Sequence, residues 1–111
     1  QSLKGGIVEK KAAKLLSERL RGLDFEEAEG WLDEELRIDL IVKRDENVIA
    51  GIQVKPATFL RMRREVITFN KNANQKWDKP VFYLFYNEKE EFENLEDLIR
   101  EIKKALFQSL F

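Results

Sequence analysis

The sequence contains no cysteine and no histidine. Without cysteine the chain has no disulfide, no thiolate zinc site and no cysteine nucleophile. Without histidine it has no Ser-His-Asp triad and no imidazole acid–base group. Any catalysis within this chain must therefore use carboxylates, lysine, amides, tyrosine or a metal ion held by oxygen atoms, and oxygen ligands favour Mg²⁺, Mn²⁺ or Ca²⁺.

Long hydrophobic runs are also absent. No apolar stretch approaches the roughly 18–20 residues that a membrane span needs, and no signal-peptide pattern opens the chain. The 111 residues are 43% hydrophobic and 37% charged, which is typical of one soluble globular domain, here residues 1–111. We therefore expect a cytoplasmic or nucleoid-associated protein without a membrane partner.

The net charge is only −1, but the charges are unevenly distributed. Residues 55–80 carry seven basic and two acidic side chains, a local charge of +5. Such a basic block can attract a polyanion, although an exposed helix with ordinary surface charges is the simpler alternative. If the block binds DNA, we expect phosphate contacts from Arg61, Arg63, Arg64, Lys71 and Lys76.

Hydrophobic periodicity predicts an alternation of helices and strands. Apolar residues at helical spacing predict helices at 3–22, 59–74 and 95–110. Alternating or apolar short runs predict strands at 25–29, 36–43, 48–55 and 81–86. Gly22 is expected to close the first helix, Pro56 to end the third strand, and the apolar run VFYLFY to form a central buried strand. This order predicts an α/β fold with a mixed central sheet flanked by helices.

The most informative segment is the predicted strand–turn–strand unit at 36–55. Asp39 lies in the first strand, and Gln53 and Lys55 stand two apart in the second, so the latter two face the same side. If the strands pair through the RDEN turn, the three side chains meet at one point on the sheet. An acid, an amide oxygen and an ammonium there are typical of a divalent-metal hydrolytic site. The alternative is a buried ion pair that only fixes the strand register.

Asp39 in one strand and the QVK motif at 53–55 in the next, within this order of elements, resemble the PD-(D/E)XK nuclease superfamily. Glu9, which follows two glycines in the first helix, matches a glutamate that members often add. The stretch GIQVKPATF, with KPVFYLFY later, is similar to restriction endonucleases of the MjaI type, and a homing endonuclease of the superfamily is an alternative relative. The resemblance implies a restriction endonuclease-like αβββαβ core.

The resemblance further implies a Mg²⁺-dependent DNA endonuclease of restriction or homing type, with Mn²⁺ as a substitute. A Holliday-junction resolvase and a non-catalytic nucleic-acid-binding domain are the alternatives. Catalytic roles fall on Glu9, Asp39, Gln53 and Lys55, and metal ligation on Glu9, Asp39, Gln53 and the carbonyl of Val54. Gln53 replaces the family's acid and should bind metal more weakly. The implied substrate is double-stranded DNA, cut by a homodimer.

Other polar and aromatic residues have a plainer interpretation. Trp31 and Trp77 are expected to be packing residues. The amides of Asn70, Asn72, Asn74 and Gln75 are of the type that reads base edges, but a helix end and loop explains them more simply.

Overall fold

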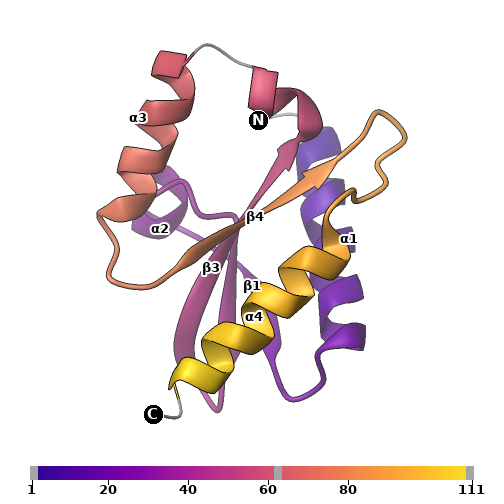
Figure 1. Cartoon of the computed structure of the whole chain (residues 1–111), viewed down its shortest axis with the longest axis vertical. Coiled ribbons are helices and arrows are strands. Elements are labelled where there is room, and N and C mark those ends of the chain that lie inside the picture. Colours follow the sequence, from indigo (N-terminus) through magenta and orange to yellow (C-terminus); the bar gives the residue numbers. More distant parts are fainter. Residues whose placement is uncertain (1–2, 62–63, 110–111) are drawn as a thin grey trace.

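The computed structural model describes residues 3–61 and 64–109 as an α/β fold (Figure 1). The elements in chain order are α1 (Leu3–Arg19), β1 (Asp24–Glu27), α2 (Trp31–Glu34), β2 (Leu40–Arg44), β3 (Asn47–Pro56), the 3-10 helix η1 (Ala57–Arg61), α3 (Arg64–Gln75), β4 (Val81–Tyr86) and α4 (Leu95–Ser109). The four strands form one mixed sheet in the order β1-β2-β3-β4. None of the described helices is long and apolar enough to span a membrane.

The two strands expected to carry the motif are neighbours, as predicted. β1 pairs with β2, and β2 with β3, antiparallel, whereas β4 runs parallel to β3. The β2–β3 turn contains Asp45 and Glu46 with φ of 50° and 69°, as a two-residue hairpin turn with two left-handed residues requires. A parallel pair needs a crossover connection, and η1 and α3 supply it between β3 and β4. The predicted mixed sheet is therefore confirmed.

One face of the sheet packs under α1 and α4. Val8 and Leu16 of α1, Ile52 of β3, Leu84 of β4 and Ile102 of α4 belong to this core and are at most 1% exposed. Full burial of such a side chain contributes about 1.5–3 kcal/mol. The buried stripe of α1 thus holds the helix against the sheet, and with it Glu9, the residue after Val8.

The opposite face of the sheet is covered by η1 and by the end of α3. Phe59 of η1 is 3% exposed, and its ring stacks on that of Tyr83 with centroids 6.1 Å apart. A Cβ atom placed on Gly51 would lie 2.7 Å from Cζ3 of Trp77 and 3.0 Å from Cγ2 of Ile38. Only glycine at position 51 therefore lets the Trp77 indole lie against β3, and Trp77 is a packing residue as expected.

The prediction of a central strand at VFYLFY is wrong, because β4 lies at the end of the sheet. Its outer edge pairs with the following loop: Phe85 N donates to Oδ1 of Asn94, and Nδ2 of Asn94 donates to the Tyr83 carbonyl, both at 2.8 Å. Glu93 N donates to the Phe85 carbonyl at 2.9 Å. The apolar run arises because helical segments cover both faces of β4. Periodicity reports whether the faces of a strand are covered, but not whether both of its edges pair with other strands.

The helical segments around α2 and α3 also differ from the predictions. The helix expected at 59–74 is divided into η1 and α3, and the short helix α2 was not predicted. Trp31, which opens α2, is 59% exposed, so its expected packing role is wrong. A four-residue helix has no second turn with which to bury one of its faces. In contrast, Gly22 with φ 95° follows α1 and Pro56 ends β3, as predicted.

Asp39 directly precedes β2 and does not lie inside the strand, so the predicted start at residue 36 is also wrong. Arg37 has φ 61°, a left-handed conformation that an L-residue with a long side chain rarely adopts and that breaks an extended strand. The chain therefore bends just before Asp39 and enters the sheet at Leu40.

Candidate active site

A cleft of about 450 Å³ lies where β3 ends and β2 begins. Its walls include all the residues predicted as catalytic groups or metal ligands: Glu9, Asp39, Gln53, Val54 and Lys55. The helix α1 provides the first, the bend before β2 the second, and β3 the other three. The structure therefore brings together residues that lie up to 46 positions apart in the sequence.

Asp39 is held at the cleft by hydrogen bonds to β3 and to the residue that follows β1. Its Oδ2 accepts from Val54 N at 2.7 Å. Its backbone N donates to the Ile52 carbonyl at 3.0 Å, and its carbonyl accepts from Ala28 N at 2.8 Å. Burial raises the pKa of Asp39 to about 6, against the opposing effects of the Val54 hydrogen bond and the Lys55 charge. The carboxylate is thus fixed in place and poorly solvated.

Glu9 reaches the same cleft from α1. Burial raises the pKa of Glu9 to about 7, and the negative charges of Asp39, Glu27 and Asp33 add to the increase, while Lys55 opposes it. The charge of Asp39 disfavours the ionised form of Glu9, and a cation bound beside both carboxylates would favour the ionised form of each. The pair Glu9 and Asp39 therefore has the electrostatic character expected of a cation site.

Gln53 is almost completely buried, with 1% of its surface exposed. The β2–β3 register pairs Leu40 with Ile52, so the next position places Gln53 opposite Asp39. Within the described residues, every buried polar side-chain atom has a hydrogen-bond partner. Gln53 thus adds a neutral oxygen to the cleft wall without adding charge.

Lys55 lies two residues beyond Gln53 on the same face of β3 and is half-buried. Its Nζ lies 5.4 Å from the centroid of the Phe59 ring, within the range of a cation–π contact. Its positive charge lowers the pKa of both Glu9 and Asp39. The ammonium is therefore positioned between an aromatic ring and the acidic cleft.

Three residues that sequence reasoning missed also line the cleft: Asp33, Glu34 and Arg37. Asp33 acts electrostatically on the site, because its charge raises the pKa of Glu9 and Asp39. The only signal in the sequence was the run of acids at 33–35 just before the motif, and acidic runs are usually solvated surface. The cleft has four carboxylates against two basic side chains, a net charge that favours a divalent cation.

The donor set fits a hard divalent ion. The described residues contain no group of three or more Asp or Glu side chains arranged to hold a metal. The cleft instead combines the carboxylates of Glu9 and Asp39 with the neutral oxygens of Gln53 and Val54. All of these donors are oxygens, which Mg²⁺ and Mn²⁺ prefer, and Mg²⁺ usually needs only one or two protein carboxylates because it keeps several waters.

Of the basic residues predicted to contact DNA, Arg61 lies beside the cleft. It lines a hollow of about 290 Å³ formed at the ends of β3 and β4. This hollow and the cleft share Pro56 as a wall residue. Arg64, exposed at the first position of α3, follows three residues later. These two arginines are therefore placed at the same end of the sheet as the cleft.

The remaining basic residues are not grouped with them. Lys71 lines a separate pocket near the start of β4, and Lys76 is exposed just after α3. Arg63 lies outside the described residues. Because α3 has 12 residues and rises about 1.5 Å per residue, it separates the two groups by up to about 18 Å. The basic block is thus divided between the two ends of α3.

The raised pKa of Asp39 predicts a specific pH dependence of stability. The native state keeps the proton up to about pH 6, whereas the ordinary value is 3.8. Between these values the native state binds more protons than the unfolded state, so the free energy of unfolding falls as pH rises. In EDTA, urea denaturation from pH 4 to pH 7 should show this fall, and Asp39→Asn should show a smaller one. An equal fall in both proteins would contradict the assignment.

No family model matches this chain, and neither do the curated proteins or the solved structures. Relatives therefore assign no activity to the cleft. Its function has to follow from the chemistry of its own residues.

Proposed function

We propose that this chain is a divalent-metal-dependent DNA endonuclease of the PD-(D/E)XK type. The observation that carries the proposal is the meeting of Asp39, the QVK motif of β3 and Glu9 on one cleft, with Asp39 bonded to Val54 N. The topology supports it: an antiparallel β1-β2-β3 meander is followed by a helical crossover to a parallel β4. Apart from α2, η1 and α4, this order of elements agrees with the αβββαβ core that the sequence resemblance implies, and it therefore supports the proposal.

The cleft residues divide into metal ligands and a phosphate-facing cation. Asp39 and Glu9, with the oxygens of Gln53 and Val54, would hold Mg²⁺. When bound, the metal supplies Lewis-acid stabilisation of the phosphate and lowers the pKa of a coordinated water. Lys55 contributes a fixed positive charge that stabilises the negative charge developing on the phosphate. Its contact with Phe59 restricts the ammonium to one region before substrate arrives.

Cleavage of both DNA strands would need two copies of the chain, because one such site cuts one strand. The twofold symmetry of a homodimer matches the pseudo-twofold symmetry of a DNA duplex. Restriction and homing enzymes use this match to cut both strands. Sequence-specific cutting of double-stranded DNA is therefore the form of the activity that we propose.

A non-catalytic nucleic-acid-binding domain is the second candidate. The neutral charge and the burial of Gln53 favour it. The residue that replaces the family's acid is neutral and 1% exposed. A site that has lost this carboxylate would keep the fold and the basic residues while binding metal too weakly for catalysis. The two candidates differ in whether DNA is cut.

The test is a nicking assay with supercoiled plasmid in Mg²⁺, in Mn²⁺ and in EDTA. The nuclease proposal expects nicked or linear product with either metal and none in EDTA. Absence of product with both metals, while the chain still shifts DNA in a gel, would support the non-catalytic candidate instead. Sequencing of the cut ends then separates sequence-specific cutting from cutting at junctions.

Arg61 gives a quantitative prediction about DNA binding. If it contacts a phosphate beside the cleft, Arg61→Ala should weaken DNA binding and reduce the slope of log K against log salt by about 0.9. Fluorescence anisotropy with a labelled duplex in EDTA measures the slope. Arg21→Ala is the matched control, because Arg21 is exposed and follows the C-terminal end of α1, so its substitution should leave the slope unchanged. Equal slopes in all three proteins would make Arg61 an ordinary surface residue.

A further inference from the structure

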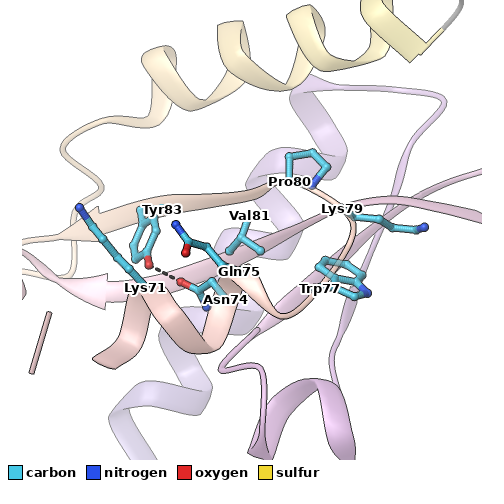
Figure 2. Close-up of a pocket in the computed structure, with 8 residues that line it drawn as sticks. All are labelled: Lys71, Asn74, Gln75, Trp77, Lys79, Pro80, Val81 and Tyr83. Carbon is cyan, nitrogen blue, oxygen red and sulfur yellow. Dashed lines mark hydrogen bonds between the residues drawn. The ribbon is translucent and has the colours of Figure 1, made fainter. Parts of the chain in front are cut away.

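A second pocket lies between the end of α3 and the start of β4 (Figure 2). Its volume is about 370 Å³, within the range of about 300–1,000 Å³ for small-molecule sites. It shares no wall residue with the acidic cleft. The two sites meet at one point of the sheet, because the register pairs Tyr83 of the pocket with Gln53 of the cleft, and they extend from there in opposite directions toward Val81 and Lys55.

The walls of this pocket are held by contacts that are already present. Asn74 is 6% exposed, and its Nδ2 donates to the Leu36 carbonyl at 2.8 Å. The Tyr83 hydroxyl donates to Oδ1 of the same side chain (Figure 2). The Trp77 indole is fixed against β3 because Gly51 leaves room for it. The pocket therefore presents a preformed aromatic wall, so that ligand binding would cost little conformational entropy for ordering these side chains.

Besides the hydrogen-bonded Asn74 and Tyr83, the polar side chains of the pocket include two lysines and the amide of Gln75. Lys71 and Lys79 lie at opposite ends of the pocket and extend away from each other, with Gln75 between them (Figure 2). Asp78 lies 3.6 Å from Lys79, but its side chain is 84% exposed, and exposed pairs of this kind are weak. The arrangement offers two separate positive charges on either side of an aromatic and amide-bearing centre.

We infer that this pocket binds one unpaired nucleotide of a nucleic-acid strand. The base would lie against the Trp77 ring, with the Gln75 amide available to its edge, and the flanking phosphates would lie at Lys71 and Lys79. Aromatic side chains bind unpaired bases of any sequence by stacking, and lysines follow the backbone. A free anion would make no use of the indole, and an apolar ligand would make no use of the lysines. The inference needs neither metal nor cleavage, and so goes beyond the proposed nuclease activity.

Trp77 itself reports on the pocket. The chain has two tryptophans, and Trp31 is exposed on α2. In a Trp31→Phe background, titration of the full chain with pentathymidylate in EDTA should quench Trp77 fluorescence to saturation. Adding Lys71→Ala and Lys79→Ala should weaken the affinity about tenfold or more through two lost phosphate contacts. The matched double variant Lys10→Ala with Lys103→Ala, at exposed lysines outside the pocket, should leave it unchanged.

Two further measurements make the result decisive. Gly51→Ala displaces the Trp77 ring without changing any charge, so it should weaken pentathymidylate binding while circular dichroism confirms the fold. A duplex should compete with pentathymidylate less well than a single strand of equal length. Absence of quenching, equal loss in the control lysine variant, or equal competition by duplex would each overturn the inference. The binding titration contains no metal, so a chain that binds pentathymidylate in EDTA but cuts no plasmid in Mg²⁺ or Mn²⁺ would reject the nuclease proposal and retain this inference.

Discussion

Replacing Asp39 with asparagine is expected to abolish DNA cleavage and divalent-metal binding together. Asparagine keeps an oxygen that can accept the hydrogen bond from Val54 N, now at 2.7 Å, so the bend before β2 should persist. It removes the half-buried carboxylate that is held in place by Val54 N and whose charge raises the pKa of Glu9. Plasmid cleavage measures the activity, and isothermal titration with Mn²⁺ measures the metal. DNA binding in EDTA should be retained, because the substitution removes no positive charge.

Asp24→Asn is the control for this prediction. Asp24 is an exposed residue of β1 that does not line the cleft, so its substitution makes the same chemical change without touching the site. It should leave both cleavage and metal binding intact. Full cleavage by Asp39→Asn would rule out the proposed mechanism, and wild-type cleavage that persists in EDTA would rule out a metal altogether.

Replacing Lys55 with methionine should separate metal binding from catalysis. Methionine keeps a long apolar stem that can pack on Phe59, but it removes the ammonium. Because Lys55 is not a ligand, metal should still bind, while single-turnover cleavage should fall by about 10²–10⁴-fold for a lost acid–base or electrostatic group. Calorimetry with Mn²⁺ measures the metal affinity, and quench-flow cleavage of a labelled duplex measures the single-turnover rate.

Lys43→Met is the matched control, since Lys43 is also a half-buried lysine on a strand. It forms an ion pair with Glu26 at 3.1 Å and does not line the cleft, so cleavage should be unchanged. Two outcomes would count against the assigned role of Lys55. Unchanged cleavage in Lys55→Met would remove it from the chemistry, and parallel loss of metal binding and cleavage would make it a structural partner of the carboxylates.

Local periodicity predicted most of the elements because it depends on neighbours in the sequence. The alternation around Val42 and Ile52 indicated two strands, and the turn residues between them indicated a hairpin, which together fix the antiparallel pairing. The helical stripe of α1 and the buried face of α4 were visible for the same reason. Within a paired hairpin, the residues of the QVK motif and the preceding aspartate must lie close together, so their meeting was also predictable.

Features that depend on distant contacts were mispredicted or not visible. The apolar run of β4 shows that both faces are covered, but its position at the sheet edge depends on the loop that carries Asn94. The left-handed Arg37 moved Asp39 out of the strand. Asp33 joined the cleft through a helix too short to leave a periodic signal. Each of these depends on packing between segments, which no local pattern records.

By itself, the sequence determined which chemistry this protein can use. It has no thiol and no imidazole, and it carries an acid, an amide and a lysine on or next to the two strands of a predicted hairpin. Only the tertiary structure decided that Glu9 and Asp33 join Asp39, because burial and mutual repulsion, which raise the pKa of Glu9 to about 7, arise when α1, α2 and the sheet meet. It also divided the basic block, since Arg64 begins α3 and Lys76 follows its last residue, which places them up to about 18 Å apart along the helix axis.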